Sequence, residues 1–483
     1  MTGTRISVTS ETGKGTKKPN VVVVICDQLR SFSIGCYGDM FARTPNIDGF
    51  AHSGFRFECG LTNSPVCTPA RSTLLSGQHA RTCVGSRTNE MENNGTILGR
   101  DDRRKFPGTT LAEEFKRRGY RTAQIGKWHV DTKPSRLGFD ESLVVRRVYT
   151  KGDFIRNEGQ LYGVPGFTPD HEVAEAKRFI SDNKSRPFFL YYNILSPHMP
   201  LLDVPYRYSR MYDPRQVPLR ENVSKNGKLP ADELWFQIYM WETWHNKQFP
   251  PVTAQATPDF TIRDLTALYY GSVSWADAQF GELMKSLREN GLEEDTIVVF
   301  TSDHGDMLGS HHKWNKDRVF EEAIRVPMIY RWPGHIKRGV SGNQLTSLMD
   351  VMPTLLDLCG GNVPHSVQGR SMARFLVGTN TEECLEDNFA FIESPFAELA
   401  IRTPTHLYAV TMTENDSGIE NGRYLFYDLR TDPYQKRNLI KTNEQIELAE
   451  ELRSKLIGWD KETPRLGSMR YTPWGGRPDG WDA

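Results

Sequence analysis

Four continuous runs of β-branched and aromatic residues stand out along the chain, at residues 20–26, 121–125, 187–195 and 296–301. Such runs are typical of strands that are covered on both faces in a parallel or mixed sheet. Helical patterns lie between them, including residues 111–118 and 264–290, each followed by a glycine where a helix would end. The alternation predicts an α/β fold: a large mixed, mainly parallel sheet sandwiched by helices.

The pattern changes after residue 375, where short strand-like runs appear at residues 388–392, 407–412 and 423–429. Thr442–Gln445 has the form of a capping box, and it predicts a helix to about residue 457. The apolar face of this helix is expected to hold Ile446, Ala449, Leu452 and Leu456. We therefore expect a disordered segment over residues 1–18, a major α/β domain over 19–375, and a smaller domain, an antiparallel sheet plus helix, over 376–483.

Polar side chains follow each of the four strand-like runs. They are Asp27 and Gln28, then Lys127 and His129, then His198, and finally Asp303, His304 and Asp306. Because the carboxyl ends of parallel strands meet at one edge of a sheet, we expect these side chains to lie close together. Asp27, Gln28, Asp303 and His304 form a candidate metal site, since hard divalent cations need several oxygen ligands. Residues 132–171 and 201–260 interrupt the alternation, and we expect loops and short helices over this edge.

A loop that turns into a helix at residues 66–77 carries Cys67 at its start. Thr68 is the expected N-cap, and Pro69 suits the first turn because its missing N–H would have no partner there. Helix N–H groups beside Cys67 favour an anion and lower the pKa of a thiol. Arg71, about one turn on, can bring its charge to the same place. The segment predicts an anion site centred on a modifiable cysteine.

Bulk charge gives no reason to expect nucleic acid or a membrane surface as a partner. Lysine plus arginine and aspartate plus glutamate number 60 each in 483 residues, so a small substrate is expected. No apolar run approaches the roughly 20 residues that span a bilayer, and residues 1–18 lack the apolar core of a signal peptide. An odd number of cysteines, seven, fits a reducing compartment and a cytoplasmic protein, although an exported chain already trimmed of its signal would look the same.

The string Cys67-x-Pro69-x-Arg71, followed by Ser72-x-Leu74-Leu75-x-Gly77, closely resembles the signature of the type I sulfatases of the alkaline phosphatase superfamily. The resemblance continues through residues 126–129, 301–333 and 424–439, in the right order along the chain. Many members have a second Asp where this chain has Gln28, which removes one negative charge from the metal site. His304 in place of Asn leaves room for a softer ion.

The resemblance implies a sulfuric ester hydrolase that cleaves a sulfate monoester, with carbohydrates among the candidate substrates. Cys67 would be converted to formylglycine (3-oxoalanine) by a formylglycine-generating or sulfatase-maturating enzyme, and the hydrate of this aldehyde would bind the metal and attack sulfur. Ca²⁺ is the expected ion, with Mg²⁺ or Mn²⁺ as alternatives. Arg71, Lys127 and Lys316 would neutralise the sulfate. His129 would act as base toward the hydrate, and His198 would act with Lys316 near the leaving oxygen.

Other interpretations stay open at this stage. A phosphonate monoester or phosphodiester hydrolase of the same superfamily would share the fold, the metal and the modified cysteine. A cysteine hydrolase would use the Cys67 thiolate with His129 or His198 as base, and a non-catalytic binding protein could use the same scaffold. Substrate choice is expected to reside in residues 132–260, which include the aromatic cluster at 235–245, and around Arg402.

Overall fold

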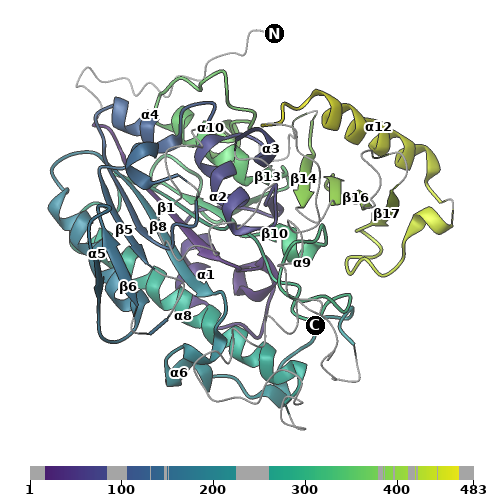
Figure 1. Ribbon diagram of the computed structural model, residues 1–483, viewed down its shortest axis with the longest axis horizontal. Helices are drawn as coiled ribbons and strands as arrows, with labels where there is room; N and C mark the ends of the chain where they lie inside the picture. Colours follow the sequence, from purple (N-terminus) through teal and green to yellow (C-terminus); the bar gives the residue numbers. More distant parts are fainter. Residues whose placement is uncertain are drawn as a thin grey trace.

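A ten-stranded sheet runs through the molecule in the order β12-β2-β11-β9-β1-β8-β4-β5-β6-β7 (Figure 1). Its four central strands are β9 (Thr296–Ser302), β1 (Asn20–Asp27), β8 (Phe188–Pro197) and β4 (Arg121–Gly126). They are parallel to one another and fully paired. The four strand-like runs of the sequence thus form neighbouring strands, which confirms the predicted mixed, mainly parallel sheet.

The computed structural model describes residues 17–466, apart from residues 84–105, 131, 146–148, 151, 225–259, 379–384, 386, 395–397, 412–418, 420–421 and 443. The aromatic cluster at residues 235–245, Cys384, most of the amino-terminal segment and most of the tail after residue 463 lie outside the described residues. Within the described part, none of the helices is long and apolar enough to cross a bilayer.

The two margins of the sheet are built from shorter strands. One margin holds β5 (Glu141–Val145), β6 (Asp153–Arg156) and β7 (Leu161–Gly163), and the other holds β11 (Met328–Arg331), β2 (Phe55–Phe57) and β12 (Val340–Gly342). The prediction of loops and short helices for residues 132–171 is therefore wrong for 141–145, 153–156 and 161–163, which extend the sheet. Residues 201–216 do form short helices: η5 (Leu201–Asp203), α6 (Tyr206–Ser209) and η6 (Pro214–Gln216).

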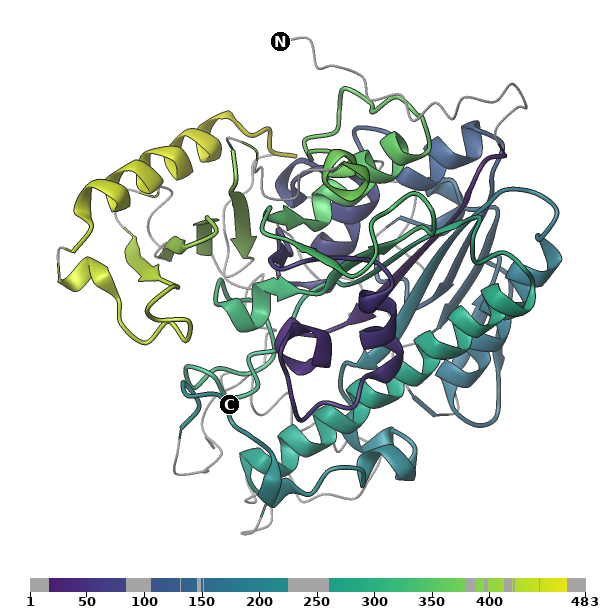
Figure 2. The same ribbon diagram turned by 180° about the vertical axis from the view of Figure 1, so that it is seen from behind.

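Alternate residues of β1 enter two separate cores. Val22 and Val24 pack on one face of the sheet against α1 (Pro45–His52), α5 (Thr168–Asp182) and α8 (Ile262–Glu289). Val21 and Val23 pack on the other face against α2 (Cys67–Ser76), α4 (Leu111–Arg117), α10 (Val351–Leu358) and α11 (Ala373–Val377). Figure 2 shows the long helix α8 crossing its face diagonally. Burial on both faces explains why β1 reads as a continuous apolar run.

The predicted helix ends are largely confirmed. Helix α4 ends before Gly119 and α8 before Gly291, and both glycines adopt left-handed φ values, 82° and 67°. Such values cost glycine little, which is why it ends helices. Helix α8 begins two residues earlier than predicted, because Thr261 and Asp264 form a reciprocal capping box.

The C-terminal domain is a four-stranded antiparallel sheet covered by one helix, as predicted. Its strands are β14 (Ala390–Ser394), β15 (Glu398–Arg402), β16 (His406–Thr411) and β17 (Arg423–Asp428), and its helix is α12 (Ile446–Glu462). The hydrophobic pattern does not predict β15. The expected capping box is wrong: α12 begins after Gln445, which has a left-handed φ of 53° and makes no side-chain cap. Ile446 is consequently 51% exposed, and the buried face of the helix begins at Ala449.

A small sheet joins the two domains. It consists of β10 (Arg325–Val326), β3 (Gly60–Leu61) and β13 (Thr346–Ser347), beside the short helix α9 (Glu321–Ile324). Leu61 and Ile324 share a buried cluster with Ile392, Ala400 and Leu407 of the C-terminal sheet. The C-terminal sheet therefore shares a hydrophobic core with the larger domain.

Arg81 of α3 (Ala80–Cys83) makes a second junction between the domains. Its Nε lies 2.8 Å from a carboxylate oxygen of Glu393 in β14, and its Nη1 lies 2.8 Å from Asp460 in α12. The guanidinium stacks 3.9 Å from the ring centre of Trp459. All of these groups are buried or nearly so, and α3 follows α2, so the junction supports the helix that carries Cys67.

We expect Arg81→Ala to destabilise the fold by about 3–5 kcal/mol, because it leaves the buried Glu393 carboxylate without its cation. The measurement is the free energy of unfolding or the thermal midpoint of the purified protein. Arg178→Ala is the matched control, since Arg178 also pairs with several carboxylates but is 40% exposed, and exposed pairs contribute about 0–1 kcal/mol. Equal losses in the two variants would contradict the role given to Arg81.

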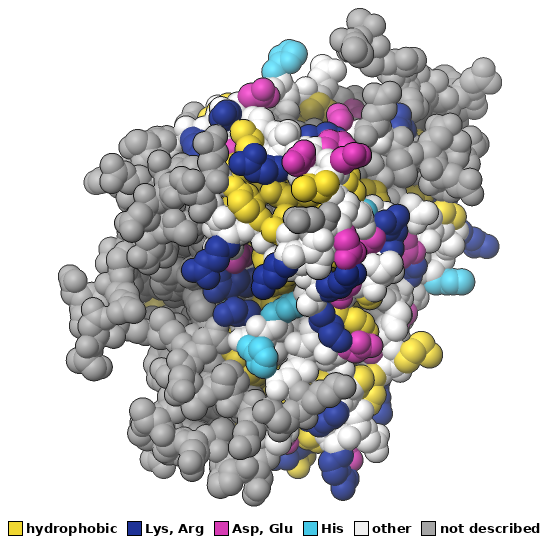
Figure 3. Space-filling model, turned by 90° about the vertical axis from the view of Figure 1, so that its right-hand side faces the viewer, with side chains coloured by type: hydrophobic (Ala, Val, Ile, Leu, Met, Phe, Trp, Pro, Cys, Tyr) yellow, Lys and Arg dark blue, Asp and Glu magenta, His cyan; other side chains and the backbone are white. Residues whose placement is uncertain are grey.

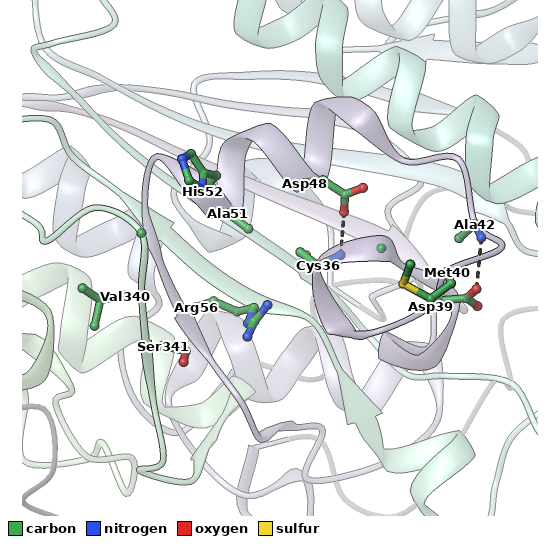
Figure 4. A pocket seen from close by; sticks show the side chains of 12 residues that line it. Cys36, Asp39, Met40, Ala42, Asp48, Ala51, His52, Arg56, Val340 and Ser341 are labelled. Atoms are coloured by element: carbon green, nitrogen blue, oxygen red, sulfur yellow. Dashed lines mark hydrogen bonds between the residues drawn. The ribbon is translucent and has the colours of Figure 1, made fainter.

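A hollow of about 500 Å³ lies between α1 and the edge strand β12. Figure 4 shows the side chains that line it. Asp48 lies on its wall and accepts a hydrogen bond of 2.6 Å from the backbone N–H of Cys36. The lining residues come from segments 35–56 and 339–341 and include none of the candidate site residues.

Candidate active site

The predicted site residues meet at the carboxyl ends of the central strands. Asp27 ends β1 and Asp303 follows β9, while Lys127 follows β4 and His198 follows β8. Gly126 makes the close approach of β4 to β8 feasible: it has a φ of 96°, and a Cβ there would overlap the backbone of Asn193. The side chains gathered here are at most 5% exposed.

Helix α2 delivers Cys67 to this edge. The helix begins at Cys67 itself, so the prediction of Thr68 as N-cap is wrong. The N-cap is Val66, which is extended and has no side-chain acceptor to offer. Pro69 lies in the first turn, as predicted. Cys67 is therefore fixed by the helix start and fully buried, with its side chain directed among the polar residues.

Four polar side chains surround the Cys67 sulfur. Its Sγ lies 2.9 Å from Nζ of Lys316, 3.5 Å from Nζ of Lys127, 3.2 Å from Nε2 of His304 and 3.8 Å from Oδ1 of Asp27. Burial and the Asp27 charge act to raise the pKa of the thiol, but Lys127, Lys316 and His304 outweigh them and hold this pKa well below its usual value. The same negative charges raise the pKa of Lys316 despite its burial. Position 67 is therefore an environment that stabilises negative charge.

Asp27, Cys67, Asp303 and His304 can act together as metal ligands. One ligand atom from each lies within 4.8 Å of the other three, and all four residues are fully buried. His304 Nδ1 lies 2.9 Å from the carbonyl oxygen of Gly305. Since a carbonyl can only accept, Nδ1 carries a proton, and the neutral ring presents the Nε2 lone pair to the cluster, as a metal ligand must. Burial and the Asp27 charge raise the pKa of Asp303. A cation would offset this repulsion between carboxylates.

Gln28 supplies a further test of whether the residues fit a cation. Its Nε2 donates to Asp306 at 2.7 Å and to Asn315 at 3.0 Å, whereas its Oε1 is buried and accepts no hydrogen bond from any described residue. A buried amide oxygen without a partner is costly unless a ligand uses it. The donor set is thus two carboxylates, an amide oxygen and an imidazole, which fits a divalent cation. Asp306 orients the amide, and its other oxygen accepts from the Leu308 backbone N–H.

Arg71 neutralises the carboxylates of the cluster. Its Nη2 lies 2.8 Å from both Asp27 and Asp303, and its Nη1 lies 2.7 Å from Oδ1 of Asn193. These bonds engage all three nitrogens of a fully buried side chain. The role of Arg71 in neutralising a sulfate stays a prediction. Sequence reasoning overlooked Asn193, a polar residue inside an apolar strand, which could have signalled a buried charged partner.

The two remaining predicted histidines differ in placement. His198 is buried, and its Nδ1 lies 2.6 Å from the Met199 carbonyl oxygen, so the neutral ring keeps its proton there. Its Nε2 then faces Asp27 Oδ1 at 3.9 Å. His129 is partly exposed and has a left-handed φ of 48° two residues after Lys127. The role of His129 as a base stays a prediction.

Comparison with known protein families adds to this geometry. The sulfatase family model matches residues 19–361, which is more than half of the chain and includes each of these side chains. The chain belongs to the sulfatase family. A second model, N-sulphoglucosamine sulphohydrolase, C-terminal, matches residues 309–462. The protein is therefore a sulfuric ester hydrolase, and sulfatases of this family generally use a formylglycine and a divalent metal.

Several characterised relatives align with nearly the whole sulfatase. An ulvan-active sulfatase from Formosa agariphila is 31% identical, over 93% of this chain and 82% of its own length. An arylsulfatase from Clostridium perfringens is 27% identical, over 91% and 94% of the two chains. Among solved structures, the putative sulfatase yidJ from Bacteroides fragilis superposes with a TM-score of 0.75 at 24% identity, covering 94% of this chain and 97% of that one. The structural likeness confirms the fold.

We expect Lys316→Ala to lower kcat of the sulfatase by about 10²–10³-fold, the effect of removing one donor aimed at developing negative charge. Lys285→Ala, which alters a half-exposed lysine of α8, should leave kcat unchanged. Steady-state kinetics with an aryl sulfate measures both variants. A Lys316→Ala enzyme with normal kcat and only a raised KM would mean that Lys316 binds the ground state without acting in the reaction.

Proposed function

We propose that this sulfatase hydrolyses a sulfate monoester on a carbohydrate, with residue 67 converted to formylglycine and Ca²⁺ as the metal. Relatives that align over most of the chain support the substrate class: one is named for ulvan, and another, 24% identical over 90% of this chain, is an N-acetylglucosamine-6-O-sulfatase. The observation that carries the proposal is the convergence of two buried lysine ammonium groups on position 67, beside four candidate metal ligands.

Asp27, Gln28, Asp303 and His304 would hold the ion, with Mg²⁺ or Mn²⁺ as the alternatives to test. The modified side chain would supply a hydrated aldehyde as nucleophile and a route by which sulfate leaves. Lys127 and Lys316 bind the sulfate oxygens and offset the charge that grows on them in the transition state. His198 holds one proton at Nδ1, toward the Met199 carbonyl oxygen, and its Nε2 lies beside Asp27. When the ring is also protonated at Nε2, that second proton passes to the leaving oxygen and the ring becomes neutral.

A substrate panel tests the proposal. The purified protein, expressed with a formylglycine-generating or sulfatase-maturating enzyme, is assayed against sulfated mono- and disaccharides, an aryl sulfate and a phosphonate monoester. We expect the highest kcat/KM on a sulfated saccharide. Higher kcat/KM on the aryl sulfate than on every saccharide would overturn the carbohydrate assignment.

The phosphonate monoester in the panel tests the alternative activity, phosphonate monoester hydrolysis. A phosphonate monoester hydrolase from Silicibacter pomeroyi superposes with a TM-score of 0.69 at 21% identity, covering 93% of this chain. A likeness at this identity concerns the fold, which hosts both activities. Preferred turnover of the phosphonate ester would replace the proposed substrate class with that one.

A further inference from the structure

A second cavity, of about 660 Å³, lies where the larger domain meets the C-terminal domain. We call it the seam cavity. Four arginines and two carboxylates line it: Arg220, Arg325, Arg402, Arg430, Glu58 and Glu321. The volume falls in the range of pockets that hold small organic ligands, and such pockets occur preferentially between domains. In Figure 3, basic side chains gather in the middle of the face on this side of the molecule, next to a hydrophobic area.

The seam cavity opens at the same sheet edge as the Cys67 site. Phe32 lies just after β1, Glu58 follows β2, and Asn343 follows β12. Strands β2 and β12 are parallel to each other, and both run in the direction of β9, because β11 is antiparallel to β2 and to β9. The part of the cavity wall that belongs to the larger domain thus lies at the ends of β1, β2 and β12, on the sheet edge that also carries Asp27 and Asp303.

Helix α9 separates the two sites and contacts both. Glu321, its first residue, lines the seam cavity. The carbonyl oxygen of Ala323 accepts a hydrogen bond of 2.8 Å from the N–H of Gly305, between His304 and Asp306. The two sites are therefore neighbours joined by one short helix.

Arg220 is held in a fixed orientation with its terminal nitrogens available. Its Nε donates to Glu322 at 2.8 Å, and its guanidinium lies 4.0 Å from the ring centre of Phe32 and 5.0 Å from that of Tyr434. The terminal nitrogens make no hydrogen bond with any residue that the structure describes. A guanidinium fixed in this way presents a pre-oriented pair of N–H donors, which matches the two oxygens of a carboxylate or a sulfate.

Arg325 adds a further unused donor. Its Nη2 donates to the Glu58 carbonyl oxygen at 2.6 Å, while its Nε is buried and lacks an acceptor within the described part of the chain. The Glu321 carboxylate pairs mainly with Arg402, which binds both of its oxygens at 2.7 and 3.1 Å, and it lies farther from Arg325, at 3.8 Å from Nη1. Arg402, where substrate choice was predicted, thus acts on Glu321.

We propose that the seam cavity binds an oxyanion, a sulfate or carboxylate group, on Arg220 and Arg325. Two sources share this chemistry: a second acidic group on an extended saccharide whose scissile sulfate lies at position 67, and free inorganic sulfate. The first source rests on the proposed function and makes the preferred substrate an oligosaccharide with several negative charges.

Binding measurements test the site apart from turnover. Isothermal titration of the full-length Cys67→Ser protein uses three probes: a heparin-derived tetrasaccharide, a monosulfated glucosamine and sodium sulfate. The test variants are Arg220→Lys, which keeps the charge but loses the paired donors, and Arg325→Gln. Arg437→Gln is the control, because Arg437 is a 60% exposed arginine of the same domain that does not line the cavity. Thermal melting shows that each variant is folded.

We expect each test variant to bind the tetrasaccharide about tenfold more weakly, as the loss of a charge-assisted hydrogen bond does. The control variant should bind the tetrasaccharide with unchanged affinity, and the test variants should bind the monosulfated glucosamine with unchanged affinity. If the test variants lose affinity for sodium sulfate but not for the tetrasaccharide, the site is supported and its ligand is the free ion. Unchanged affinity for both the tetrasaccharide and sodium sulfate in both variants would overturn it. Turnover of sulfate esters by the unsubstituted enzyme is measured separately: its absence with intact binding would reject only the proposed function.

Discussion

Replacing Cys67 with alanine is expected to reduce sulfatase activity by at least about 10³-fold, because the loss of a nucleophile leaves only binding and charge stabilisation. Cys67→Ser should be equally inactive in steady state when the serine stays an alcohol, because a sulfated serine has no second hydroxyl with which to expel the sulfate. The measurement combines kcat/KM on an aryl sulfate with mass spectrometry of the peptide that spans residue 67. In the active enzyme this peptide should be lighter than the unmodified thiol peptide.

Cys359→Ala is the matched control, since Cys359 is a free, partly buried cysteine at the end of α10. It should leave activity unchanged. An active enzyme whose residue 67 is an intact thiol would favour the cysteine hydrolase instead. Its nucleophile would then be the thiolate that Lys127 and Lys316 stabilise.

Asp27→Asn is expected to lower kcat/KM by about 10³-fold, since a bound cation supplies several kcal/mol of transition-state stabilisation. Asp27 is a candidate ligand and also pairs with Lys127 and Arg71. Its pKa is held well below the usual range because Lys127, His198 and Arg71 outweigh the effect of burial, so the asparagine removes a full charge. Chelator treatment of the unsubstituted enzyme should have a similar effect, reversed by Ca²⁺.

Asp182→Asn is the control for this substitution, because Asp182 is exposed on α5 and, among the residues that the structure describes, pairs only with Arg178. It should change neither kcat/KM nor the response to chelator. Restoration by Mn²⁺ or Mg²⁺ but not Ca²⁺ would replace the proposed ion. Full activity after exhaustive chelation would mean that the buried carboxylates act without a metal.

The central strands and their polar ends were predictable from the sequence because both faces of these strands are buried. Every residue of β1, β8 and β9 is buried, so each reads as a mostly apolar run, and the polar residues after it mark the active edge. Strands β6 and β7 are short and half-exposed at the margin of the sheet. Their sequences carry no comparable signal, and the pattern of residues 132–171 therefore predicts loops and short helices.

Contacts between distant segments could not be predicted in the same way. Gln28 and Asn315 are held together by one hydrogen bond, although 287 positions separate them. Nothing in the local pattern of either segment indicates that pairing. Lys316 lies on a loop with no periodicity of its own, so its place beside Cys67 was expected only from the family resemblance. The burial of Arg71 between two carboxylates likewise depends on tertiary packing.

The charge at residue 67 differs between the unmodified cysteine and the proposed aldehyde. Arg71, Lys127 and Lys316 face two carboxylates, Asp27 and Asp303, and the thiolate of unmodified Cys67 supplies a third negative charge. The immature enzyme therefore carries its own resident anion in the place where a sulfate ester would bind. If residue 67 is converted as proposed, oxidation to the uncharged aldehyde would vacate that place, and maturation would create affinity for the substrate as well as a nucleophile.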